Sequence, residues 1–133
     1  MATVPLIQHD QASDAVRAVY DDIMQKRGVN DVNNFWKAAA HSPALLSSIW
    51  NQVQETMQAG ALDALTKELI YIAVSATNNC HYCVHSHTAA ARAKGMTPEQ
   101  YAELLAVIAM ASQTNALAKS LQVPVDAQFK APE

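Results

Sequence analysis

Charged and aromatic side chains are both scarce in this sequence. Only 16% of its 133 residues are Asp, Glu, Lys or Arg, and 6% are aromatic. An average globular chain carries about 25% charged residues, so some helix faces here have too few charges to face water. We therefore expect part of the surface to be covered by other subunits.

Basic clusters and long apolar runs are also missing. The net charge is −3, and no basic cluster exceeds the pair Lys26-Arg27, so neither a nucleic-acid nor a membrane partner is expected. The N-terminus lacks the basic and apolar regions of a signal peptide. The longest apolar run, residues 69–74, is far shorter than the about 20 residues of a membrane helix. These features predict a cytoplasmic protein, where a close cysteine pair is typically catalytic or metal-binding.

The backbone composition favours helices. There are three glycines and five prolines against twenty-five alanines, and no segment alternates with period two. The sequence predicts an all-α fold. Its length predicts one domain spanning residues 1–133.

Capping and helix-breaking residues place the helices. After an extended arm, helical segments are expected over residues 13–28, 35–40, 42–60, 63–77, 80–94 and from 97 to before Pro124. The segment 63–77 carries apolar side chains almost all round, as expected of a buried central helix. These are Leu65, Leu69, Ile70, Ile72, Ala73 and Val74. The last helix is predicted to bury one apolar stripe: Tyr101, Leu104, Leu105, Ile108 and Ala111.

The most unusual stretch lies between Glu68 and Arg92, which contains no charged residue but holds both cysteines. Cys80 and Cys83 are three apart at the start of a predicted helix, so they share a face and lie within disulfide reach. A helix N-terminus favours the thiolate over the thiol. His87 follows Cys83 by one turn on that face, where it can exchange a proton with the sulfur.

Glu68 lies twelve residues before Cys80, on the preceding helix. Antiparallel packing of the two helices would bring its carboxyl group back to the cysteines. In charge-free surroundings, desolvation would raise its pKa and suit it to passing protons at neutral pH. Two sulfurs with a carboxylate and an imidazole are what thiol-disulfide chemistry requires.

The pattern Glu-x11-Cys-x-Tyr-Cys-x3-His, formed by Glu68, Cys80, Tyr82, Cys83 and His87, resembles the signature of the alkylhydroperoxidase D-like (AhpD-like) proteins of the carboxymuconolactone decarboxylase superfamily. Similar flanking patterns are Phe35-Trp36, Ser42-Pro43-Ala-Leu-Leu, Leu62-Asp63 and Gly95-Met-Thr-Pro-Glu. The resemblance covers about residues 30–121, leaving an N-terminal arm and helix over 1–29 and a tail over 122–133.

The resemblance implies an orthogonal bundle of about six helices that assembles into trimers or hexamers and reduces hydroperoxides with a dithiol or protein reductant. It also implies that Cys83 is the peroxidatic cysteine, oxidised to a sulfenic acid, and Cys80 the resolving one. Glu68 and His87 would form the proton relay. The best-studied members have a histidine where this chain has Tyr82, and a tyrosine is a hydrogen-bond donor but a poor base. We expect no cofactor and no metal ion.

Other interpretations remain open. The helix dipole taken alone favours Cys80 as the attacking thiol, because Cys80 lies nearer the start of the helix. Structural zinc could take Cys80, Cys83, His87 and Glu68. A non-enzymatic helical oligomer is a third interpretation. A fourth is decarboxylase-type proton chemistry on a small lactone, although the superfamily's lactone decarboxylases generally lack the cysteine pair. His81 and His85, four apart on another stripe, are expected to face solvent or an interface.

Overall fold

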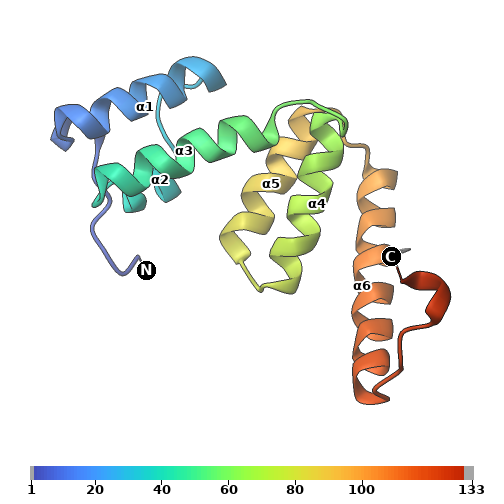
Figure 1. Ribbon diagram of the computed structural model, residues 1–133. Helices are drawn as coiled ribbons and strands as arrows, with labels where there is room; N and C mark the ends of the chain where they lie inside the picture. Colours follow the sequence, from blue (N-terminus) through green and yellow to red (C-terminus); the bar gives the residue numbers. More distant parts are fainter. Residues whose placement is uncertain (1, 131–133) are drawn as a thin grey trace. The chain divides into compact units, whose positions relative to one another are not determined.

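A computed structural model describes residues 2–130, which form six α-helices and two short 3₁₀-helices (Figure 1). No strand occurs among these residues, and the all-α prediction is confirmed. The chain divides into two compact units, residues 1–58 and 59–133. Each is described by itself, and the single-domain interpretation stays a prediction.

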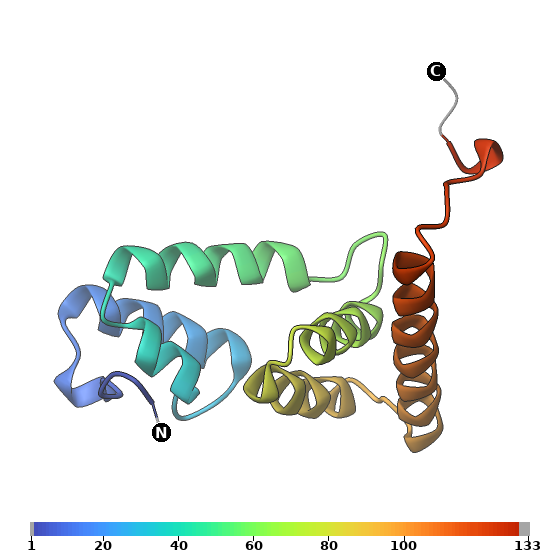
Figure 2. The ribbon, with the colours of Figure 1, turned by 90° about the horizontal axis from the view of Figure 1, so that it is seen from below.

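The first unit consists of η1 (His9–Gln11), α1 (Asp14–Arg27), α2 (Asn34–Ala39) and α3 (Pro43–Met57). The predicted caps form: Ser13 accepts a hydrogen bond from the Val16 amide, and Ser42 accepts one from the Leu45 amide. Gly28 ends α1 at φ 64°, a left-handed conformation that suits glycine. Helices α1 and α3 lie side by side (Figure 2).

The core of the first unit is closed by aromatic side chains. Tyr20 is fully buried and donates a hydrogen bond to the Ile7 carbonyl at 3.0 Å. Trp36 and Trp50 meet edge to face with their centroids 5.5 Å apart, and the Arg27 guanidinium lies over both rings. Such contacts add to the free energy gained by burying apolar area.

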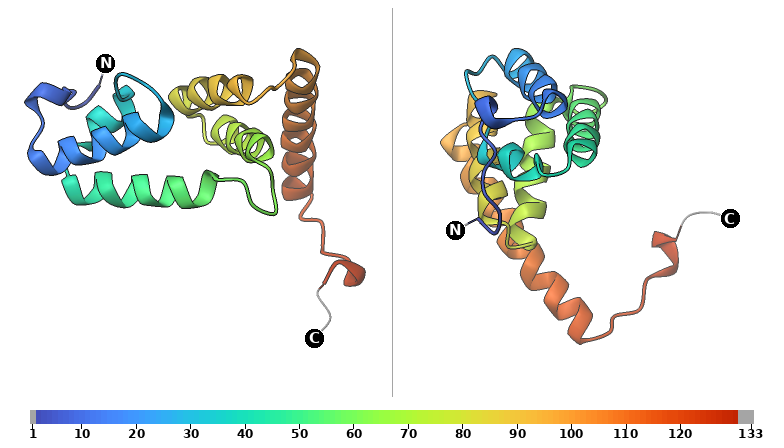
Figure 3. Two further views of the ribbon diagram at one scale, coloured as in Figure 1. Left: turned by 90° about the horizontal axis from the view of Figure 1, so that it is seen from above. Right: turned by 90° about the vertical axis from the view of Figure 1, so that its left-hand side faces the viewer.

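The second unit consists of α4 (Ala64–Thr77), α5 (His81–Ala93), α6 (Pro98–Ser120) and η2 (Ala127–Phe129). Helices α4 and α5 pack side by side and run antiparallel, because only a short turn joins them (Figure 3). The turn closes because Asn79 takes φ 56°, which Asn tolerates better than most residues. The small buried core of the second unit consists of Ile72, Ala91 and Met96.

The remaining caps match the predictions. The Asp63 carboxylate accepts a hydrogen bond from the Thr66 amide at the start of α4. Gly95 follows α5 at φ 93°. Thr97 and Gln100 form the predicted capping box of α6, which ends at Ser120.

Burial of α4 and α6 differs from the prediction. On α4, Ile70 and Val74 are 49% and 53% exposed, and no residue of α6 is buried within the chain. Tyr101 and Leu104, near the start of α6, are its only residues packed against the buried core of this unit. Ile108 and Ala111, further along the same predicted stripe, are partly buried as well, whereas Leu105 is 46% exposed. These exposed faces are where the sequence predicts contacts with other subunits.

The C-terminal tail is exposed as far as it is described, and residues 131–133 of the predicted tail lie outside the described residues. It contains η2, which the sequence did not predict. No described helix combines the length and the apolar character that crossing a membrane requires.

Candidate functional site

The two cysteines lie where α5 begins. Cys80 is its N-cap residue and Cys83 lies in its first turn, and the two sulfurs are joined in a disulfide with a Cα–Cα distance of 5.3 Å. The Cys83 amide donates a hydrogen bond to the Cys80 sulfur at 3.3 Å. A free N-terminal amide of the helix therefore points at a sulfur, as expected where a thiolate is to be stabilised.

Glu68 and His87 meet across the antiparallel helices. Glu68 Oε2 lies 2.7 Å from His87 Nδ1, although the residues are 19 apart in sequence. Glu68 is only 4% exposed, and its hydrogen-bond partners in the described chain are His87 and Lys94, not a cysteine. Antiparallel packing thus brings the carboxylate to the histidine one turn after Cys83.

The sequence analysis missed Lys94. Its Nζ lies 2.9 Å from Glu68 Oε1, so the buried carboxylate binds a different partner with each oxygen. A signal for this was present, because Lys94 lies seven residues after His87. That spacing is two helical turns and places both side chains on one face of α5.

The charge on Glu68 corrects one expectation. Burial raises the pKa of its carboxyl group, but hydrogen bonds from His87 and Lys94, together with the Lys94 charge, outweigh burial and hold the pKa below its usual 4.5. The predicted rise was wrong because His87 donates a hydrogen bond to the carboxylate and Lys94, outside the charge-free stretch, reaches back to it as well. Glu68 is therefore a carboxylate at neutral pH.

Tyr71 is a second missed neighbour. Its ring stacks on the His87 imidazole with centroids 3.5 Å apart and planes at 18°. Tyr71 lies three residues after Glu68, which places both on the same face of α4. The imidazole is thus fixed by a carboxylate at Nδ1 and by an aromatic face.

This geometry sets the protonation pattern of His87. A carboxylate at Nδ1 favours a proton on that nitrogen, which leaves Nε2 to accept or release a second proton. The pair can therefore move protons, while a neighbouring cysteine pair can store two electrons as a disulfide.

Tyr82 lies between the two cysteines in the first turn of α5, with 42% of its surface exposed. Its participation in the site stays a prediction. The zinc set considered from the sequence is not assembled, because the sulfurs are bonded to each other and Glu68 binds Lys94. Within residues 2–130, no three His, Cys, Asp or Glu side chains are grouped as a metal centre.

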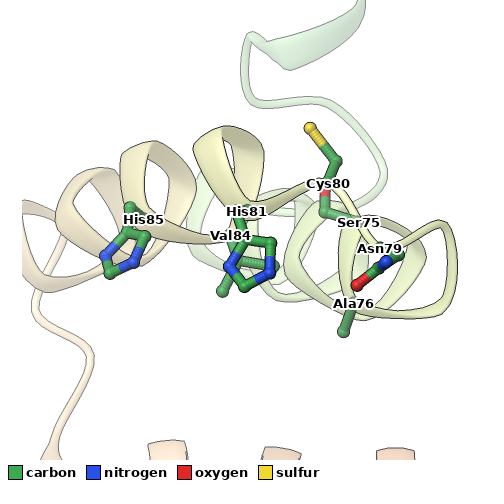
Figure 4. Close-up of a pocket in the computed structure, with 7 residues that line it drawn as sticks. All are labelled: Ser75, Ala76, Asn79, Cys80, His81, Val84 and His85. Carbon is green, nitrogen blue, oxygen red and sulfur yellow. The ribbon is translucent and has the colours of Figure 1, made fainter. Parts of the chain in front are cut away.

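A pocket of about 220 Å³ opens beside Cys80 (Figure 4). Of the predicted site residues, only Cys80 lines it. His81 and His85, which the sequence placed at solvent or an interface, are exposed and form part of its wall. The other lining residues are Ser75, Ala76, Asn79 and Val84.

Comparison with known proteins gives consistent results. The model of the carboxymuconolactone decarboxylase family matches residues 43–126. A crystal structure of the alkylhydroperoxidase AhpD core from Rhodospirillum rubrum is 53% identical, superposes with a TM-score of 0.91, and is covered over 99% of both chains.

Two uncharacterised proteins are also similar. One, from Cupriavidus necator, is 34% identical over 83 residues, which are 62% of this chain and 74% of that protein. The other, from Paracoccus denitrificans, is uncharacterised protein 4 in the cox locus. It is 44% identical over 50 residues, which are 38% of this chain and 45% of that protein.

Proposed function

Because the chain belongs to the carboxymuconolactone decarboxylase family and has the AhpD-like fold, we propose that it reduces hydroperoxides with its cysteine pair. The observation that carries the proposal is the disulfide at the start of α5, with the Glu68–His87 pair held one turn further along the same helix. Neither part alone would specify redox chemistry.

The reaction proceeds through two sulfur steps. The Cys83 thiolate attacks the terminal oxygen of a hydroperoxide, so the O–O bond breaks, the sulfur becomes a sulfenic acid, and the alkoxide leaves and takes up a proton as an alcohol. The Cys80 thiol then attacks the sulfenic sulfur, forming the disulfide and releasing water. An external dithiol or protein reductant returns the pair to the dithiol. Each turnover moves two electrons and consumes one hydroperoxide.

The resemblance assigns the attack to Cys83, and its location one turn before His87 supports that order. Nε2 of His87 takes the thiol proton and returns a proton to the leaving alkoxide. Glu68 holds the imidazole in the required tautomer, and Lys94 keeps Glu68 ionised in its buried location. Tyr82 acts as a hydrogen-bond donor beside the sulfurs.

The assembly and location of the protein are proposals as well. The uncovered apolar faces of α4 and α6 support a homo-oligomer, and the subunit is expected to form a single AhpD-like domain acting in the cytoplasm. Burying those faces between copies would remove apolar area from water.

Peroxide consumption with a dithiol donor tests the reaction. The wild-type protein should turn over, while Cys83→Ser should lose activity by about a thousandfold or more. Cys80→Ser should react once and then accumulate sulfenic acid at Cys83. Turnover retained in Cys83→Ser would reject the proposal.

A second candidate activity uses the same carboxylate and imidazole without sulfur. The matching family model includes lactone decarboxylases by name, and the Glu68–His87 contact involves neither sulfur. Proton chemistry on a small lactone would then persist in a Cys80→Ser/Cys83→Ser double variant. This candidate is removed if the wild type reduces hydroperoxides and the double variant has no activity on lactones.

A further inference from the structure

The five histidines of the chain differ in how they are bound. His9 contacts the Asp21 carboxylate, His41 contacts the Pro5 carbonyl, and His87 contacts Glu68, each at 2.7 Å. Within residues 2–130, His81 and His85 are the two histidines whose rings have no hydrogen-bond partner. Both nitrogens of both rings are therefore available to a ligand.

These two histidines lie on one face of α5. They are four residues apart, which puts their Cβ atoms roughly 5–6 Å from each other on a helix. Figure 4 shows the two rings on the same side of α5, one turn apart, at the wall of the pocket beside Cys80. An imidazole pair at this spacing can bind one metal ion with two bonds of about 2.0–2.1 Å after small rotamer changes.

We propose that His81 and His85 together bind a divalent transition-metal ion of the Zn²⁺ or Ni²⁺ class at this pocket. Imidazole is a favoured ligand of these ions, whereas Mg²⁺ and Ca²⁺ prefer oxygen ligands and should not bind. The pocket of about 220 Å³ has room for the ion and several water molecules, each of which occupies about 30 Å³ in the liquid. Those waters complete the coordination shell, and the Asn79 amide in the same wall can hydrogen-bond to one of them.

This site differs from the zinc set considered from the sequence. It uses neither sulfur and neither member of the Glu68–His87 pair. His81 and His87 are six residues apart, which turns their side chains about a third of a turn from each other on the helix. The ion would therefore be held beside Cys80 while the carboxylate–imidazole pair keeps its own contacts.

The test is metal binding by protein with its disulfide intact and no histidine tag, so that neither free thiols nor a tag contribute ligands. Isothermal titration with ZnCl₂ and with NiCl₂ should give one ion per chain, and MgCl₂ should give no binding. His81→Gln and His85→Gln should each weaken binding by at least about tenfold, because each removes half of a chelating pair. His41→Gln is the matched control and should bind as wild type.

The exposed location of both side chains means that the variants should fold, which circular dichroism checks. In wild-type protein, Zn²⁺ should shift the imidazole resonances of His81 and His85 in NMR spectra and leave those of His9 and His41 in place. Absence of binding by wild type, or wild-type affinity in both pocket variants, would overturn the proposal. Peroxide reduction is measured separately with a chelator present, so either idea can fail without the other.

Discussion

The two units of the chain contain buried ionic groups of opposite kinds. In the first, the cation is buried: Lys37 is 7% exposed and reaches Asp31 at 2.6 Å and Gln8 at 2.9 Å. In the second, the carboxylate of Glu68 is buried and its cationic partner Lys94 is partly solvated. Lys37 joins Gln8 and Asp31 to the buried core of the first unit, whereas Glu68 binds the His87 imidazole. A buried charge thus joins segments of the chain in one unit, and in the other it orients the imidazole that we propose as the proton carrier.

The largest effect should come from the proton carrier. His87→Gln keeps a donor for Glu68 but removes the exchangeable proton, so kcat/KM for hydroperoxide should fall by about 10²- to 10⁴-fold. His41→Gln in the first unit, which loses only a contact to the Pro5 carbonyl, should retain full activity. Steady-state peroxide assays compare them. Equal losses of kcat/KM in His87→Gln and His41→Gln would mean that the histidine of the second unit has no special role in the reaction.

Apolar side chains provide the next test, because the two units differ in how far the chain itself buries them. Leu46 is fully buried in the first unit, and Leu46→Ala should lower the free energy of unfolding by about 2–5 kcal/mol. Leu105 on α6 is 46% exposed within the chain, so Leu105→Ala should cost under about 1 kcal/mol in an isolated subunit. If copies of the chain cover α6, the loss should grow with protein concentration.

Urea unfolding at two protein concentrations, with sedimentation to report assembly, separates these cases. A large loss for Leu105→Ala at every concentration would mean that the chain itself covers this helix.

Lys94→Met should have a smaller effect on activity and a distinct one on its pH dependence. Without the cation, burial of Glu68 is opposed by His87 alone, so the pKa of the carboxyl group should rise. The acidic limb of the kcat/KM profile should then move to higher pH, with a loss of under about tenfold at pH 7. Lys94→Arg should restore the profile, and Lys37→Met should leave it unchanged. A Lys94→Met profile that only scales downward would assign Lys94 a purely structural role.

The sequence was sufficient for features set by neighbouring residues. Ser13, Ser42, Asp63 and Thr97 cap helices as predicted, because a cap depends on a hydrogen bond three residues away. It was also sufficient for the antiparallel packing of α4 and α5, since a short turn forces two helices to run antiparallel. The predicted approach of Glu68 to the cysteines differs from the structure, where the carboxylate meets His87 and Lys94.

It was insufficient where the outcome depended on packing between elements. The predicted apolar stripe of α6 is only partly buried, because apolar character predicts burial without saying whether this chain or another one supplies the covering surface. Lys94 and Tyr71 were missed because each belongs to the site through contact with a residue on the other helix. The predicted direction of the Glu68 pKa was wrong for the same reason: hydrogen bonds from His87 and Lys94, together with the Lys94 charge, outweigh the effect of burial.

The smallest expected effect concerns stability in acid and isolates Glu68 itself. Because the pKa of its carboxyl group in the folded protein lies below 4.5, the unfolded chain binds the proton more readily than the folded one. The ion pair therefore stabilises the fold above pH 4.5, and this contribution disappears as the pH falls through the folded pKa. With Lys94 partly solvated, it should amount to on the order of 1 kcal/mol. Urea unfolding between pH 3 and pH 7 should show a shallower acid loss in Glu68→Gln than in wild type, and equal slopes would mean that the pair makes no net contribution.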